Sequence, residues 1–229
     1  MPLYRAELLR QRYVLAKPKI HDLSQVLYLP FDRDDGSYAR DRSGYNNHGV
    51  IYGARRVDGV IGNALSFDGV DDRIVVANSG SLNPTSAATW MFWVILKPGD
   101  GKYKAVIAKF GYDPSLGLYT GWDFYVDPWN AMGFYFRYPQ NVSIGDRSPL
   151  FEVWVHYALV NNGSHSWLYR NGVLINERDM VLPSPTAHSL TIGSRGTALF
   201  GDHVIDEVRM YNRALSEAEI RRIMFMSGV

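Results

Sequence analysis

Short apolar runs, separated by turn residues, fill the chain from Val26 onward. The clearest runs are VLYLPF, HGVIYG, DRIVVA, ATWMFWVILKP, KAVIAKF, WDFYV, MGFYFRY, WVHYALV, SWLYRNGVLI, HSLTIGS and HVIDEVRMY. Each has the length of a β-strand, and each either alternates apolar with polar residues or is rich in β-branched and aromatic residues. The runs recur roughly every ten residues, which is typical of a β-sandwich or barrel. The pattern therefore predicts an all-β fold.

Two of the predicted turns carry a hairpin signature. The segment Arg170–Gly172 contains Asn-Gly, a pair that accepts the positive φ angles of a type I′ turn. The segment Asn161–Ser164 resembles a second hairpin connection between two apolar runs. We therefore expect the strands on either side of these turns to be antiparallel neighbours.

The end of the chain changes from a strand pattern to a helical one. A last strand of roughly eight residues is expected before a turn at Asn212–Leu215. Ser216 then stands where a helix N-cap belongs, and Glu219 follows three residues later, as in a capping box. A one-sided apolar stripe follows, formed by Ala218, Ile220, Ile223 and Met224. The pattern predicts a short capped helix that lies on the sandwich.

Residues 1–25 differ from the rest, and we interpret them as a basic N-terminal arm before one domain at residues 26–229. The arm has apolar residues loosely at helical spacing, and Pro18 would end a helix there. It would pack on the body, form a disordered leader, dock on a partner during assembly, or associate with a membrane surface. It lacks the continuous apolar stretch of a signal peptide. Localisation stays open between a virion or phage particle and an extracellular assembly.

Composition removes several classes of function. The net charge of the 229-residue chain is +1, so there is no electrostatic case for nucleic acid as the main partner. Cysteine is absent, which excludes disulfides and Cys metal sites. No apolar run approaches the roughly 18 residues of a membrane span.

Four ordered motifs resemble one known family. The motifs are GNALSFDGVDDRIVV (62–76), WVHYALVNNGSHSWLYRNGVLI (154–175), LTIGSR (190–195) and IDEVRMYNRALSEAEI (205–220). They are similar to the laminin-G-like, concanavalin A-like jelly rolls, over about residues 26–226. The resemblance implies a two-sheet antiparallel jelly-roll sandwich. Members of the family include lectins, adhesion modules, virion proteins and glycoside hydrolases, so the function must be argued from the site.

No arrangement of acidic residues favours an enzyme. A retaining glycosidase needs two carboxylates about 5–5.5 Å apart. The resemblance implies that the hydrolases of this superfamily place them at alternate positions of one strand. Asp123 and Asp127 are four residues apart, and Asp206 and Glu207 point to opposite faces of a strand. We therefore expect no catalytic residues.

Calcium is the metal that the resemblance favours. It implies that the first and last strands lie side by side, often bridged by a structural calcium with Asp206 as a ligand. Asp32, at the end of the first strand, would be a second ligand, with carbonyl groups near Asn47–Gly49. The alternative is that Asp206 caps turn amides and Asp32 begins an Asx turn. The acidic loop Asp68–Arg73 also has two interpretations. It could bind a cation or a sugar, or it could be a tight turn whose aspartates bond their own backbone.

Aromatic residues concentrate between Gly117 and Tyr138. One face of a strand there would fill the core, and the other would present aromatic and polar groups suited to a sugar. If a ligand binds, we expect the contacts to come from Trp122, Asp123, Tyr125, Trp129 and Arg137. The alternatives are that these residues only fill and cover the two sheets, or that they form a protein interface.

Two functions follow from this sequence. The first is a non-catalytic, lectin-like module that binds a glycan or cell-surface polymer, with a structural calcium. The second is a virion or surface assembly protein whose jelly roll is the body and whose N-terminal arm attaches to itself or to other structural proteins.

Overall fold

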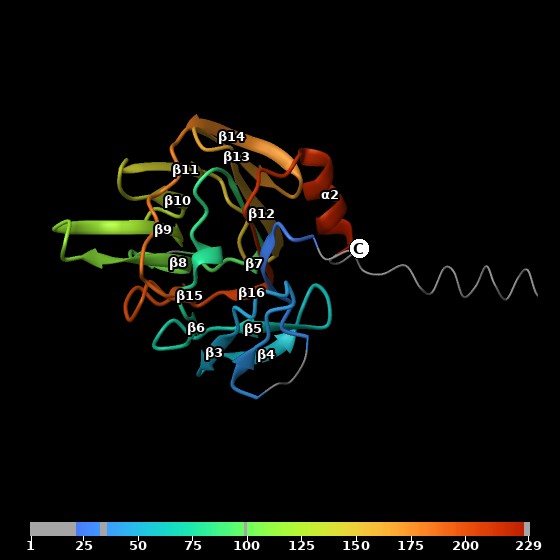
Figure 1. Cartoon of the computed structure of the whole chain (residues 1–229). Helices are drawn as coiled ribbons and strands as arrows, with labels where there is room; N and C mark the ends of the chain where they lie inside the picture. Colours follow the sequence, from blue (N-terminus) through green and yellow to red (C-terminus); the bar gives the residue numbers. More distant parts are fainter. Residues whose placement is uncertain (1–21, 33–35, 99, 227–229) are drawn as a thin grey trace, which may run out of the picture.

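Two antiparallel sheets pack face to face in the computed structural model, which describes residues 22–32, 36–98 and 100–226 (Figure 1). The predicted all-β class, with two antiparallel sheets and one short C-terminal helix, is confirmed. The predicted arm falls mostly on residues 1–21, which lie outside the described residues. Of its last residues, Gln25 already belongs to the first strand.

The first sheet, here sheet A, has the strand order β14-β13-β12-β7-β16-β5-β4, and β1 also pairs with β16. Its strands are β1 (Gln25–Leu29), β4 (Arg55–Asp58), β5 (Asn63–Ser66), β7 (Ala88–Ile95), β12 (Trp154–Asn161), β13 (His165–Arg170), β14 (Val173–Asp179) and β16 (Val204–Tyr211).

The second sheet, here sheet B, has the order β11-β10-β9-β8-β15-β6-β3-β2. Its strands are β2 (Tyr38–Ala39), β3 (Gly49–Tyr52), β6 (Arg73–Val76), β8 (Lys104–Asp113), β9 (Leu118–Val126), β10 (Met132–Phe136), β11 (Val142–Asp146) and β15 (Leu190–Ile192). A 3-10 turn, η1 (Gly80–Leu82), and the helix α2 (Glu217–Met226) complete the described elements.

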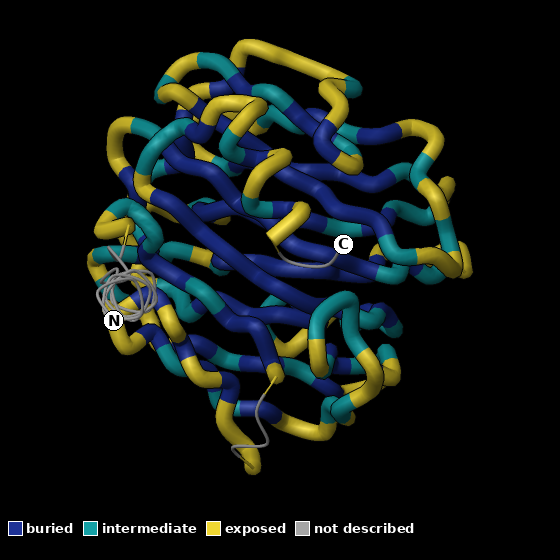
Figure 2. Tube along the Cα trace, turned by 90° about the vertical axis from the view of Figure 1, so that its right-hand side faces the viewer, coloured by how far each residue is buried: buried dark blue, intermediate teal, exposed yellow. Residues whose placement is uncertain are grey.

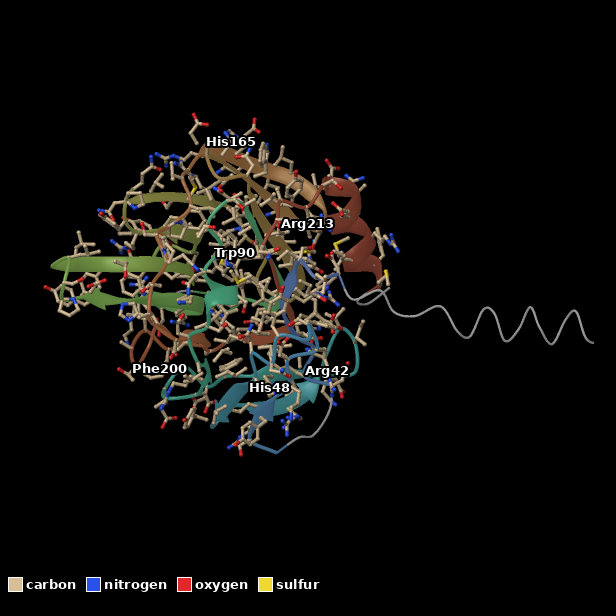
Figure 3. All side chains as sticks on the ribbon, viewed as in Figure 1. Arg42, His48, Trp90, His165, Phe200 and Arg213 are labelled. Atoms are coloured by element: carbon tan, nitrogen blue, oxygen red, sulfur yellow. The ribbon has the colours of Figure 1, made fainter. Side chains whose placement is uncertain are left out.

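The main core lies between the sheets and is rich in aromatic rings. Strand alternation sends Trp90 and Phe92 inward from β7, and Trp122 and Phe124 inward from β9. The Trp90 ring meets the Trp122 ring edge-on at 5.3 Å, and Phe92 stacks on Phe124 at 5.6 Å. Trp90 lies near the middle of the molecule in Figure 3, and the buried strand segments run through its interior in Figure 2.

The first and last strands are neighbours, as the family resemblance implies. Strand β1 pairs with β16, so that Leu29 faces Val208 in the ladder. The expected hairpin between β13 and β14 is also present, with φ angles of 51° at Asn171 and 73° at Gly172. Positive φ at both positions is the type I′ pattern that Asn-Gly predicts.

A second apolar cluster lies on the outer face of sheet A. The capping box forms as predicted, because the Ser216 amide donates to Glu219 Oε2 and the Glu219 amide donates to Ser216 Oγ. Helix α2 thereby starts over the sheet and packs Ile220 against it. The cluster consists of Met91, Ala158, Val160, Tyr169, Tyr211, Leu215 and Ile220. Arg213 lies beside this helix in Figure 3.

The two sheets are also joined along one side, where the edge strands β14 and β11 meet. Asn176 Nδ2 on β14 donates to the Gly145 carbonyl on β11 at 2.9 Å. Arg178 Nη1 donates to the Ser143 carbonyl at 2.8 Å. Side chains of sheet A thus donate hydrogen bonds to backbone carbonyl groups at the edge of sheet B.

Candidate functional site

The outer face of sheet B carries groups of aromatic rings linked by two arginines, Arg137 and Arg195, and we name this set of rings the aromatic strip. It contains Tyr103, Phe110, Tyr112, Tyr119, Tyr125 and Tyr135. Phe110 stacks on Tyr119 at 5.2 Å, and Tyr112 meets Tyr119 at 5.5 Å. From Tyr119 to Tyr125 the strip spans about 20 Å of β9. This length suits an extended ligand better than a single small one.

Alternation along the strands produces this strip. On β10, Phe134 and Phe136 face the core, so Gly133 and Tyr135 face outward. A Cβ on Gly133 would lie 2.5 Å from Tyr125 Cζ, so the glycine leaves room for the Tyr125 ring across the ladder. The partly exposed rings at the two ends of the strip include Tyr103 at 41% and Tyr119 at 55% exposed.

A buried carboxylate lies at the centre of the strip. Asp123 is 0% exposed and forms an ion pair with Arg195, which follows β15. Burial raises the pKa of Asp123, and the Arg195 guanidinium opposes that rise. Asp123 Oδ1 and Arg195 Nε are both buried without a hydrogen-bond partner in the described part of the chain. Such atoms are costly to leave unpaired. Buried atoms without a partner also occur away from the strip in the described residues, including Trp90 Nε1 in the core and His203 Nε2.

Arg137 adds a second guanidinium to the centre. Its Cζ lies 3.9 Å from the centroid of Tyr135 and 5.5 Å from that of Phe110. Arg195 Cζ lies 4.8 Å from the same Phe110 ring. The two arginines therefore share one aromatic ring, a geometry that holds guanidinium planes against π faces.

An open pocket of about 350 Å³ adjoins one end of the strip. Tyr103 belongs to both, since its ring meets Tyr125 at 5.5 Å and also lines the pocket. Lys104 Nζ lies inside this region, where it bonds the Pro98 carbonyl at 2.8 Å and Asp202 Oδ1 at 3.0 Å. Another lining residue, Phe200, appears at the periphery of the molecule in Figure 3. The pocket mixes acidic, basic and aromatic groups.

The five predicted ligand residues divide between three places. Asp123, Tyr125 and Arg137 come together on the outer face of sheet B. Trp122 is 3% exposed and packs in the core, so its assignment to a ligand surface is corrected: it alternates with Asp123 and faces the opposite way. Trp129 is 78% exposed in the turn between β9 and β10, where Asp127 Oδ1 accepts its amide proton.

Other parts of the strip were absent from the sequence prediction. Phe110 and Tyr112 alternate on β8, which is a readable signal of a shared face. Arg195 had no such signal, because it reaches Asp123 from a loop 72 positions away. Long-range loop placement depends on the closed fold and not on local pattern.

The two predicted calcium residues lie against one turn, between β4 and β5. Asp206 Oδ2 accepts the Val60 amide at 2.9 Å, and Asp32 Oδ1 accepts the Asn63 amide at 3.4 Å. Asp206 Oδ1 accepts the amide of its neighbour Glu207 at 2.7 Å. These amides account for the positions of the two carboxyl groups without a cation, although a carboxylate has about four acceptor sites. The arrangement favours the amide-capping alternative for Asp206, and calcium stays a prediction.

Burial is the main influence on the pKa of Asp206, which lies against this turn. Asp206 is fully buried, and burial followed by the nearby Glu207 raises the pKa of Asp206 to about 7. The amides of Val60, Ile61 and Glu207 oppose the rise. Asp206 is thus a structural carboxyl group at the junction of β16 with the β4–β5 turn.

The acidic loop between β5 and β6 has the geometry of a turn. Asp68 Oδ1 accepts the Val70 amide at 2.8 Å, and Asp72 Oδ2 accepts the Asp68 amide at 3.0 Å. Carboxylate oxygens of Asp68, Asp71 and Asp72 lie within 4.8 Å of one another, the one such acidic or histidine group in the described residues. Hydrogen bonds within the loop account for its shape.

One pair of carboxylates at alternate positions, which the sequence analysis did not predict as a site, lies on β14. Glu177 and Asp179 share a face of β14, and both lie near His165, at 3.5 Å and 2.6 Å. Their side chains are 56% and 95% exposed. A glycosidase acid needs an environment that raises its pKa, and exposed carboxylates beside a histidine do not provide one.

No helix in the described ranges is both long and apolar enough to cross a membrane.

The fold is similar to solved binding domains of toxins. The binding domain of Paraclostridial Mosquitocidal Protein 1 aligns with a TM-score of 0.69 and 20% identity, covering 87% of this chain and 51% of that chain. The botulinum neurotoxin serotype D ligand binding domain, in complex with N-acetylneuraminic acid, aligns with a TM-score of 0.70 and 13% identity, covering 89% and 51%. At these identities the likeness shows the fold alone. This chain spans about half the length of those structures.

The sequence itself carries the family assignment. A search of curated protein sequences found no match. A family model named Laminin_G_3, described as the concanavalin A-like lectin/glucanases superfamily, matches residues 68–221, which is more than half of the chain. The match includes every strand from β6 to β16. The chain therefore belongs to the concanavalin A-like lectin/glucanases superfamily.

Proposed function

We propose that this protein is a non-catalytic binding module that recognises a glycan or surface polymer through the aromatic strip. Sugar rings have apolar C–H faces that pack on aromatic rings, and hydroxyl groups that bond to charged or amide side chains. The strip offers both kinds of group along about 20 Å of strand. The toxin neighbours support the proposal as binding domains, one of them holding N-acetylneuraminic acid.

A single observation carries this proposal. Unpartnered buried atoms of Asp123 and Arg195 lie at the centre of a row of partly exposed tyrosines. A purely structural ion pair would be expected to satisfy its own hydrogen-bonding atoms. A ligand hydroxyl or carboxyl group that displaced a neighbouring side chain would supply the missing partners of these buried atoms.

Glycan-array binding tests the proposal. We expect the wild-type chain to bind a subset of immobilised glycans, and Tyr119→Ala to reduce that signal. Phe225→Ala is the matched control, because Phe225 is 54% exposed on α2, on the other sheet, and should leave the signal unchanged. A blank array with folded wild-type protein would overturn the proposal.

The assembly function remains a second prediction from the sequence, since the arm that would mediate it lies mostly outside the described residues. Size-exclusion chromatography with and without residues 1–25 tests it. A smaller particle after removal of the arm would support assembly. An unchanged size would count against it.

The structural calcium also remains a prediction, and thermal unfolding tests it. If calcium binds at Asp32 and Asp206, the Tm of the wild-type chain should rise with calcium over EDTA, and Asp206→Asn should abolish the rise. Equal Tm values in calcium and EDTA would refute it. Glycan binding through the strip does not depend on the result.

A further inference from the structure

We propose that the ligand of the aromatic strip is an acidic glycan, whose carboxylate group binds Arg137 beside the Asp123–Arg195 pair. This inference rests on the proposed function and names its ligand class. It follows from three features of the centre: the balance of charges, the free donors of Arg137 and the orientation of its guanidinium.

The centre of the strip has an excess of positive charge. Asp123 forms its ion pair with Arg195, and Arg137 is the additional cation in contact with the same Phe110 ring. Among the described residues Arg137 makes no ion pair with Asp123, although its charge lowers the pKa of Asp123. One carboxylate between two guanidinium groups leaves a net charge of about +1 in a half-buried place. A negative group on the ligand would balance it.

Arg137 has donors to spare. Its side chain makes one long hydrogen bond, from Nη1 to Tyr135 Oη at 3.4 Å. Its Nε is buried and has no hydrogen-bond partner among the described residues. A guanidinium presents five N–H groups, and two parallel ones match a carboxylate or sulfate. The side chain is therefore held in place by its rings, and the N–H groups of Nη1 and Nη2 are the donors that a ligand would contact, since Nε is buried.

Ring contacts orient this side chain before a ligand arrives. Arg137 lies over Tyr135 at 3.9 Å, and its backbone amide donates to the Gly121 carbonyl at 2.8 Å. Stacking on an aromatic face leaves the edge of the guanidinium free for an anion. Because less side-chain entropy is lost on binding, such an arginine is a strong anchor for a charged group.

The overall charge of the chain does not explain a preference for an acidic ligand. The whole chain carries a net charge of +1, and the pocket at the end of the strip combines Asp68, Asp100 and Asp202 with Lys102 and Lys104. The mixed charges of that end offer an acidic polymer no clear attraction, so the attraction comes from the centre. The preference for an acidic ligand is a local property of the arginines.

The experiment compares acidic oligosaccharides with their own neutral forms. Uronate-bearing and sialate-bearing hexasaccharides are immobilised beside their methyl esters, which keep the sugar rings and lose the charge. Binding of the wild-type chain, Arg137→Gln, Arg137→Lys and the control Arg222→Gln is measured by surface plasmon resonance. Arg222 is exposed on α2, on the other sheet.

We expect the free acids to bind about tenfold more tightly than the esters, as one charged bidentate contact predicts. Arg137→Gln should remove this difference, Arg137→Lys should keep part of it, and Arg222→Gln should keep all of it. If Arg137→Gln does not fold, the acid–ester comparison on the wild type decides alone.

Two results would overturn the inference in distinguishable ways. Equal binding of acids and esters, or unchanged acid binding by folded Arg137→Gln, would refute the acidic ligand and leave glycan recognition standing. Failure of every acidic and neutral probe to bind the wild-type chain would refute both the inference and the proposed function.

Discussion

The outer faces of the two sheets are built from similar alternating strands, but one face is covered by a helix and the other is partly exposed. On sheet A, helix α2 covers an apolar cluster that includes Met91 and Ile220, both at most 1% exposed. On sheet B, the outward residues are partly exposed tyrosines around the Asp123–Arg195 pair. Figure 1 shows α2 on the side of the molecule opposite the tip of the β8–β9 hairpin.

The difference separates two uses of a sheet face. Apolar contact under the helix stabilises the fold in proportion to the area removed from water. A charged centre with unpartnered buried atoms stabilises it little, since desolvation offsets much of the Coulomb attraction. A face that contributes little to folding stability but holds its hydrogen-bond donors in fixed positions is suited to binding a ligand. Variants on the two faces should therefore affect different measurements.

The largest effect on stability is expected under the helix. Ile220→Ala removes a fully buried side chain, and the free energy of unfolding should fall by about 2–4 kcal/mol in urea denaturation. Glycan binding by the remaining folded protein should be unchanged. Phe225→Ala, on the exposed side of the same helix, should change stability by less than about 0.5 kcal/mol. Loss of binding in folded Ile220→Ala would show that the two faces are not independent.

A smaller and pH-dependent effect is expected at the centre of the strip. Arg195→Gln leaves the Asp123 carboxylate buried without its ion partner, which should destabilise the fold by about 1–3 kcal/mol at pH 7. The folded-state pKa of Asp123 is already raised by burial, and loss of Arg195 should raise it further. The folded state then binds the proton more tightly than the unfolded state.

The sign of the pH effect follows from that difference. Stability of the variant should increase as the pH falls from 7 toward the ordinary pKa of aspartate, so its deficit relative to the wild type should shrink at pH 5. Urea denaturation at the two pH values measures the change. A deficit that grows at pH 5 would contradict a buried, unpaired carboxylate.

Removal of a single ring from the strip should weaken glycan binding more than it lowers the free energy of unfolding. Tyr119→Ala removes a ring that stacks on Phe110 and is 55% exposed, so we expect about 1 kcal/mol of lost binding, or about fivefold in Kd. Its free energy of unfolding should change by less than about 0.5 kcal/mol. Isothermal titration with a glycan identified on the array measures the first, and urea denaturation the second. The opposite pattern would assign Tyr119 to packing alone.

The smallest effect tests the arrangement of the strip rather than its residues. Gly133→Ala would put a Cβ 2.5 Å from Tyr125 Cζ, so the ring must move and the affinity should fall about two- to threefold. Gly80→Ala is the control, because a Cβ there meets nothing within 4 Å. Equal affinity of Gly133→Ala and wild type would show that the position of the Tyr125 ring does not matter.

Local pattern predicted the sheets and much of the strip, and tertiary contacts decided the rest. Period-two alternation correctly put Asp123 and Tyr125 on one face, and the same rule excludes Trp122 from it. The pattern did not predict Lys109 as a fully buried residue, because its ammonium group is satisfied by distant carbonyls, including that of Thr186 at 2.7 Å. Such partners come from loops that only the folded chain brings near.

The contact between the two edge strands also bears on how copies of this chain behave at high concentration. A free strand edge offers backbone carbonyl groups to any passing strand, which is how many β proteins begin to aggregate. Asn176 and Arg178 already occupy the carbonyls of Gly145 and Ser143 along β11. This edge of sheet B therefore offers fewer free carbonyl groups for intermolecular strand pairing, and this protection should hold in any solvent that leaves these two hydrogen bonds intact.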